Sequence, residues 1–242
     1  MENNKDFLVK NQKQIEEIKQ EIIQIPKGKV EKSYFSGPSI YFHQEALKCC
    51  RNEKEFLGKR HIEMIYATLV AWGMHRMGKS GAKMPDFDVF KKSILDKKQK
   101  LQQLKTIRIE KVQEKALDDI IGRLKELIFK EDGINASETN SRIVSGTKVL
   151  AHILPDIVPP MDRNYTAAYF GINIQNSSQN LFDNGMHTIW NVYQDKNVRD
   201  RALEYHKEHV YISLPKLFDN VIIKLEQSKK KTTNNKTTKS KK

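Results

Sequence analysis

The sequence predicts an all-α, globular protein of about eight to ten helices of unequal length. In most segments of the 242-residue chain, apolar residues recur at spacings of three and four, the period of a helix with one buried face. Pro, Gly and capping residues separate these segments. No segment shows a convincing alternating strand pattern, although residues 30–35 and 210–214 stay ambiguous. Residues 1–227 are expected to form one helical domain, either undivided or as two lobes that meet near 130–165.

In the first half, helices are expected over residues 4–25, from Ser36 or Ser39 to about residue 47, and over 62–77, 87–104 and 110–130. Pro26 and Gly28 end the first, and Asp86 can cap the fourth. The segment 62–77 is the most apolar, so it should be central and buried on most sides. Because a glycine weakens a helix interior, Gly73 indicates close packing or a nearby ligand there.

In the second half, helices are expected from Asn135 or Ser137 to residue 154, and over 162–170, 180–193, 197–210 and 215–227. Asn135 or Ser137 can cap the first of these, and Pro215 suits the first turn of the last. Residues 171–179 are polar and rich in turn formers, so a loop is expected there. Pro159 and Pro160 fix the backbone before Asp162, which can accept an amide hydrogen bond as an N-cap. This stretch predicts a stiff helix–turn–helix corner.

The positive charge of the chain is unevenly distributed. The formal net charge is +13, and residues 229–242 contain seven lysines and no acid. A segment of Lys, Thr, Asn and Ser cannot offset its ordering entropy by burial, so residues 228–242 are expected to be a disordered basic tail. The tail is either a tether to nucleic acid or another anionic surface, or a solubilising tail without catalytic interest.

Composition also predicts the compartment. The sequence contains no long apolar run and no signal-peptide pattern, which favours a soluble, cytoplasmic protein without membrane contact. Cys49 and Cys50 are adjacent and can scarcely form an ordinary disulfide, which indicates a reducing environment.

The sequence lacks most of the short motifs that indicate a particular catalytic or binding chemistry. The sequence contains no Gly-rich phosphate loop, no nucleophile elbow and no zinc-type cysteine pairing, and no cofactor or metal is expected. His206 and His209, three apart on a predicted helix, either share a metal with Glu204 or are simply solvated. Lys91, Lys92 and Lys98 belong to a lysine-rich helix that either tracks phosphates or presents a solvated face.

Two resemblances arise from particular phrases. G-P-S-I-Y-F-H from Gly37, Y-A-T-L-V-A-W-G-M-H-R-M-G from Tyr66 and L-P-D-I-V-P-P-M-D-R-N-Y-T from Leu154 resemble a family of uncharacterised helical proteins from prokaryotes, which supplies no activity. S-G-T-K-V-L-A followed by P-P-M-D-R-N-Y, within residues 142–170, resembles the helix-hairpin-helix DNA glycosylase superfamily. In that superfamily a glycine-rich hairpin presents amides to a DNA phosphate, and a lysine nucleophile and a catalytic aspartate follow.

The second resemblance implies roles for individual residues. Gly146 would match the last hairpin glycine, Lys148 the nucleophile of the lyase-competent members and Asp162 the catalytic carboxylate. Arg142 and Arg163 flank these positions and are expected to contact nucleic acid. The chain lacks the Pro-Gly pair of the family hairpin, and the separation of Lys148 from Asp162 is shorter than in the family.

The expected function is therefore that of a DNA-binding protein similar to base-excision glycosylases and AP lyases, acting on a flipped or damaged nucleotide. Two alternatives stay open. One is a helical nucleic-acid-binding or adaptor protein without catalysis, and the other is a partner-binding protein whose basic charge only aids solubility.

Overall fold

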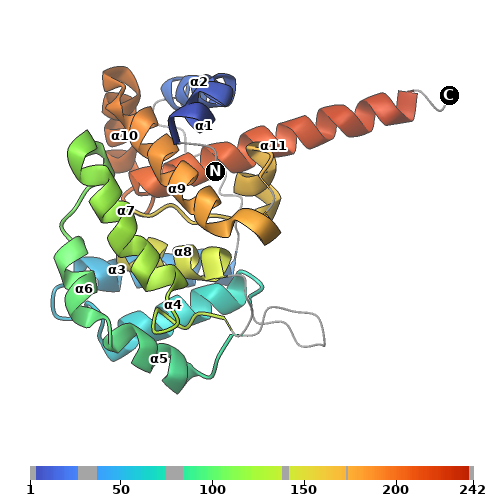
Figure 1. Cartoon of the computed structure of the whole chain (residues 1–242). Coiled ribbons are helices and arrows are strands. Elements are labelled where there is room, and N and C mark those ends of the chain that lie inside the picture. The colour runs from blue at the N-terminus through green and yellow to red at the C-terminus, as the bar shows by residue number, and fades with distance from the viewer. Residues whose placement is uncertain (1–3, 27–36, 75–83, 138–141, 173, 240–242) are drawn as a thin grey trace.

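The computed structural model describes residues 4–26, 37–74, 84–137, 142–172 and 174–239 (Figure 1). Its α-helices are α1 (Asn4–Lys10), α2 (Gln12–Ile23), α3 (Pro38–Arg51), α4 (Lys59–Ala71), α5 (Phe87–Leu95), α6 (Lys98–Leu104), α7 (Glu114–Phe129), α8 (Arg142–Ile153), α9 (Ile174–Gln194), α10 (Lys196–Glu208) and α11 (Leu214–Lys239). A 3-10 turn, η1 (Ile109–Lys111), and a π-helical turn, η2 (Arg163–Ala167), complete them. No strand occurs within the described ranges, so the all-α prediction is confirmed.

Two expected helices are each divided in the structure, which raises the helix number. Asn11 interrupts 4–25, where its buried side chain donates to the Phe7 carbonyl at 3.0 Å. Such a side chain competes with the helical backbone pattern. The expected helix 87–104 breaks between α5 and α6, where the Lys97 amide donates to the Ile94 carbonyl at 3.0 Å. Periodicity missed both breaks because the apolar stripe continues across them.

The most apolar helix ends earlier than predicted. α4 begins at Lys59 and ends at Ala71, and Gly73 follows with φ of 75°, in the left-handed region that glycine adopts without strain. Apart from its two chain neighbours, no atom of the described residues lies within 4 Å of the position that a Cβ on Gly73 would occupy, so these residues do not pack closely against it. Gly73 instead terminates the helix. The predicted residues 75–77, and the proposed cap at Ser36, lie outside the described residues.

The second half also differs from the prediction at element boundaries. α9 begins at Ile174, so most of the loop expected over 171–179 is helical. Residues 210–213 form a connection between α10 and α11 and no strand. Asp195, two residues before the predicted helix 197–210, caps α10 by accepting from the amides of Asn197 and Val198.

The last helix extends into the basic tail. α11 includes residues 228–239, where the sequence predicts disorder, and in Figure 1 this part projects from the body. The extension begins with contacts to the body: Lys229 Nζ lies 3.9 Å from the centre of the Tyr169 ring, and Lys230 Nζ donates to the Asn164 carbonyl at 3.0 Å. Adding residues to an existing helix avoids the cost of nucleation, which accounts for the continuation.

α8 occupies the middle of the arrangement. It contacts α3 and α4 on one side and α7 and α9 on others, while α2, α10 and α11 pack together elsewhere (Figure 1). The buried apolar residues of α1 to α11 form one continuous cluster, in which Ile143, Leu150 and Ile153 of α8 are fully buried. Cys49 and Cys50 are buried free thiols, as expected. Within the described ranges, no helix combines the length and the hydropathy that crossing a membrane requires.

Candidate functional site

The structure brings Lys148 and Asp162 together. Lys148 lies in α8 on the side away from its apolar stripe, and its Nζ is 3.0 Å from Asp162 Oδ2. The two side chains are 13% and 25% exposed, so the pair is largely sheltered but still reachable from solvent. The 13 residues between them form the end of α8 and the Pro-rich corner, which folds back on the helix.

The corner holds Asp162 in a fixed position. Asp162 Oδ1 accepts from the Asn164 amide at 2.8 Å, which makes Asp162 the N-cap of η2, as the sequence predicts. The Asp162 amide donates to Thr166 Oγ1 at 3.2 Å, and the preceding amide, of Met161, donates to Thr147 Oγ1 at 3.0 Å. One carboxylate oxygen is therefore used for capping, and the other is directed at Lys148.

A tryptophan and a second lysine complete the polar surroundings. Trp72, at the end of α4, has its ring centre 5.9 Å from Lys148 Nζ and 5.6 Å from Lys216 Nζ. Lys216 lies in the first turn of α11 and pairs with Asp219 at 2.5 Å. We call Trp72, Lys148, Asp162, Lys216 and Asp219 the lysine cluster. Sequence reasoning missed Lys216 and Asp219; their spacing of three at the start of a predicted apolar helix was the available signal.

Asp219 is the most deeply placed carboxyl group of the lysine cluster. Burial raises its pKa above the ordinary value, while the Lys216 ammonium and the more distant Lys148 lower it. The negative charge of Asp162 also raises the pKa of Asp219, so the two carboxyl groups interact electrostatically within the lysine cluster.

Two histidines pack beneath Trp72. The ring centre of His152 lies 5.1 Å from that of Trp72, and that of His43 lies 5.8 Å away. His152 Nδ1 faces the Lys148 carbonyl at 2.7 Å, and a carbonyl can only accept, so Nδ1 carries the proton. His152 Nε2 can then only accept from His43 Nδ1, at 2.9 Å, while His43 Nε2 lies 3.3 Å from the Tyr211 carbonyl, so a neutral His43 ring can donate to only one of these two acceptors.

Burial keeps this histidine pair uncharged. It lowers the pKa of His152 to about 4 and that of His43 well below its ordinary value, and the mutual repulsion of the rings and of Lys216 acts in the same direction for His43. His61 supports the pair from α4: its Nδ1 accepts from the Leu57 amide and its Nε2 donates to the His152 carbonyl at 3.2 Å. These three histidines have a structural role: their hydrogen bonds hold in place the rings that pack against Trp72.

Gly146 does not occupy the position that the hairpin resemblance implies. It lies within α8, not in a loop, and its buried face packs against Ile128 of α7. A Cβ at Gly146 would come within 2.9 Å of Ile128 Cγ2. Close helix–helix packing, rather than approach to a phosphate, therefore explains this glycine.

We expect Gly146→Ala to lower the free energy of unfolding by about 1 kcal/mol. The added methyl group overpacks against buried Ile128, and this destabilisation is larger than the stabilisation from the higher helix propensity of alanine. Gly122→Ala is the matched control. Gly122 is exposed in α7 with no atom within 4 Å of its missing Cβ, so alanine should stabilise by about 1 kcal/mol. Urea denaturation measures both, and equal effects of the two substitutions would contradict the packing assignment.

The two arginines have different placements. Arg142 donates through Nη1 to the carbonyls of Phe129 and Lys130, so its guanidinium satisfies the carboxyl end of α7. Arg163 is exposed in η2, directly after Asp162. Of the two, Arg163 is the one whose side chain is open to a ligand beside Asp162.

The predicted lysine track lies elsewhere. Lys91 and Lys92 belong to α5 and Lys98 to α6, and Figure 1 shows these helices well apart from α11. Acids neutralise much of this run: Lys92 pairs with Asp96, Lys97 with Asp132, Lys100 with Glu126 and Lys105 with Glu53. The structure thus does not bring Lys91, Lys92 and Lys98 to the lysine cluster.

His206, considered above as a metal ligand, directs Nδ1 at the Ile212 carbonyl at 2.7 Å. In the part of the chain that the structure describes, no three or more His, Cys, Asp or Glu side chains gather in a way that could hold a metal ion. Comparisons of the chain with protein-family models, with curated proteins and with solved structures found no match.

Proposed function

We propose that the protein is a DNA glycosylase or AP lyase that acts on a flipped or damaged nucleotide, with Lys148 as the nucleophile and Asp162 as its carboxylate partner. The observation that carries the proposal is the 3.0 Å contact between Lys148 Nζ and Asp162 Oδ2 in a sheltered position beside Trp72. An amine and a carboxylate held together in this way are the groups that attack at a sugar carbon requires.

Each group of the pair would have one role. Lys148 Nζ would form a bond to the sugar C1′ while the bond from C1′ to the base breaks, and the departing base would take up a proton. The amine proton would pass to Asp162, whose charge would also stabilise positive charge that develops on the sugar. The C1′–O4′ bond of the sugar would then break, with O4′ taking the proton from Asp162, and the resulting protonated imine between Nζ and C1′ is the intermediate through which a lyase cleaves the strand.

The surroundings suit a flipped nucleotide. Trp72 is partly exposed and lies next to Lys148, so its indole offers a stacking surface for an unpaired base. Basic groups also lie close to Asp162: Arg163 is adjacent in sequence, and Lys230 of α11 donates to the Asn164 carbonyl and lies 5.4 Å from the Tyr165 ring. The basic extension of α11 therefore starts beside the proposed centre, where it could bind phosphates. The buried free thiols of Cys49 and Cys50 fit a cytoplasmic location.

Borohydride reduction tests this proposal. Incubated with a duplex that contains an abasic or oxidised-base site, the wild-type protein should give a covalent protein–DNA adduct on reduction, and Lys148→Gln should lose the adduct while still binding DNA. Lys125→Gln is the matched control, because Lys125 also pairs with a largely buried aspartate, Asp183, at 2.8 Å. Its adduct should match that of the wild type.

The outcomes separate the candidate functions. Base release without an adduct would assign a monofunctional glycosylase that uses water, in which Asp162→Asn rather than Lys148→Gln abolishes activity. Absence of both adduct and base release across a panel of lesions would contradict the catalytic proposal. Binding to undamaged DNA that weakens steeply with salt would then favour the non-catalytic nucleic-acid-binding protein, for which the basic extension of α11 is the supporting observation.

A further inference from the structure

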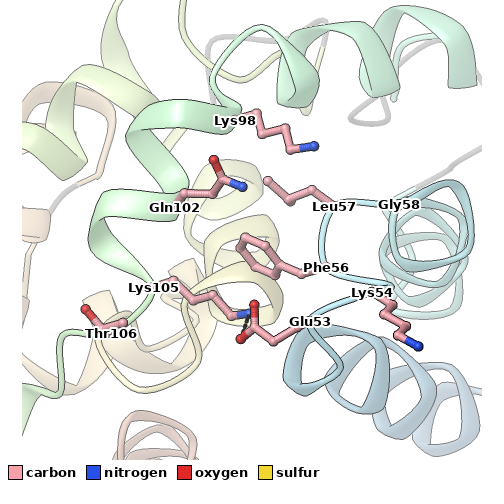
Figure 2. A pocket seen from close by; sticks show the side chains of 9 residues that line it. All are labelled: Glu53, Lys54, Phe56, Leu57, Gly58, Lys98, Gln102, Lys105 and Thr106. Atoms are coloured by element: carbon pink, nitrogen blue, oxygen red, sulfur yellow. Dashed lines mark hydrogen bonds and ion pairs between the residues drawn. The ribbon is translucent and has the colours of Figure 1, made fainter.

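A second candidate site lies away from the lysine cluster. A cavity of about 420 Å³ opens between the turn that joins α3 to α4 and the outer side of α6 (Figure 2). It is lined by Glu53, Lys54, Phe56, Leu57, Gly58, Lys98, Gln102, Lys105 and Thr106. This volume falls in the range of small-ligand pockets, which are usually several hundred Å³.

The inner wall is apolar and held in place. Phe56 and Leu57 are buried, and the Asn52 carbonyl accepts from the amides of both Glu55 and Phe56. Leu57 has φ of 56°, in the left-handed region, and its amide donates to His61 Nδ1 at 3.1 Å. A leucine stays in this costly conformation only where its surroundings fix it. The turn therefore forms a preformed wall rather than a loop that has to order on binding.

The charge of the rim is positive. Lys98 is exposed, makes no ion pair with any described residue, and extends in Figure 2 across the opening towards Leu57. Lys105 Nζ lies 4.0 Å from the centre of the Phe56 ring and 2.8 Å from Glu53 Oε1. The Glu53 side chain is 85% exposed, so an anion could displace it from Lys105 at little cost. Gln102 lies between the two lysines in Figure 2 and can donate from its amide.

The surroundings favour a small anion over a nucleic-acid strand. A strand needs cations in a continuous row, but Lys92, Lys97 and Lys100 on the same helices are each paired with an acid. Of the lysines at this cavity, Lys98 has no acid partner among the described residues, and Lys105 has only the exposed Glu53, beside an apolar wall. Such a site matches a molecule with one compact dianionic group and a carbon skeleton.

We propose that this cavity binds a small phosphate monoester of mononucleotide size, with its phosphate between Lys98 and Lys105 and its carbon skeleton against Phe56 and Leu57. Two charged contacts to phosphate would supply orientation, and displacement of Glu53 would accompany binding. The proposal does not depend on the chemistry of Lys148, and Lys148→Gln should leave this binding unchanged.

Titration calorimetry with AMP, ribose 5-phosphate, adenosine and inorganic phosphate tests it. The two phosphate monoesters should bind, adenosine should not, and inorganic phosphate should bind more weakly than AMP because it lacks contact with the apolar wall. Lys98→Gln and Lys105→Gln should each weaken AMP binding by about fivefold or more. Glu53→Gln should strengthen it, since the competing carboxylate is removed.

Lys92→Gln is the control. Lys92 is an exposed lysine of the same region that pairs with Asp96, and its replacement should not alter AMP binding. A thermal melt of Lys105→Gln shows whether loss of its contact with Phe56 has unfolded the protein; Lys98→Gln, which removes no such contact, keeps the test decisive. Equal effects of Lys98→Gln and Lys92→Gln, no AMP binding at millimolar concentration, or binding only of a 5′-phosphorylated oligonucleotide would each overturn the proposal.

Discussion

Replacing Lys216 by methionine should lower the free energy of unfolding by about 3–5 kcal/mol, because it leaves the Asp219 carboxylate buried without its nearest cation. The side chains of Lys216 and Asp219 are only 10% and 5% exposed, and their charged atoms are 2.5 Å apart. Burial already raises the Asp219 pKa against the opposing effect of Lys216. In the variant, Asp219 should take up a proton more readily, so the stability difference from the wild type should shrink as the pH falls.

Urea denaturation of three variants at neutral pH tests this expectation. Lys196→Met is the matched control: Lys196 also pairs with an aspartate, Asp200, at 2.6 Å, but the two side chains are 77% and 53% exposed. Its loss should cost less than about 0.5 kcal/mol. The double replacement Lys216→Met and Asp219→Leu should recover most of the loss, since no buried charge remains. A loss below about 1 kcal/mol for Lys216→Met would show that Asp219 is solvated or compensated in another way.

Stability should fall strongly between pH 6.5 and pH 5, because His43, His61 and His152 stay uncharged in the folded protein. Burial lowers the pKa of His61 and of His152 to about 4 and lowers that of His43 well below its ordinary value. In the unfolded chain each ring takes up a proton near pH 6.5, so the unfolded state binds more protons and gains stability as the pH falls. Each histidine should therefore lower the free energy of unfolding by up to about 2 kcal/mol when the pH falls to 5.

The pH window separates this effect from those of the carboxylates. Glu126, whose pKa is lowered to about 2 by Lys100 and Lys130, loses its contribution only below its ordinary pKa of about 4.5. Asp219, with a raised pKa, acts in the opposite sense to the histidines. Unfolding free energies measured in urea at pH 7, 6 and 5 should show the decline, and His61→Gln should reduce its slope. An unchanged slope in that variant would mean that His61 is protonated in the native state.

The sequence alone determined the local features. The helical class followed from apolar spacing, and the capping role of Asp162 followed from its position after Pro159 and Pro160, because a cap needs only its own next few residues. The choice of Lys148 as a candidate side chain also came from sequence, through resemblance, and its catalytic role stays a proposal. Breaks such as Asn11 were missed because a buried side-chain hydrogen bond leaves the apolar period unchanged.

The tertiary structure decided which of these residues meet and what surrounds them. His43 and His152 are 109 residues apart, and Trp72 and Lys216 come from the ends of two other helices, so no spacing rule could relate them. The role of Gly146 likewise depends on tertiary structure, because the residue that packs against it, Ile128, lies on a neighbouring helix. Periodicity records which face of a helix is buried, whereas the partner of that face depends on how whole helices pack. For this reason the stripe of α8 was predictable, and the burial and charge of the lysine cluster were not.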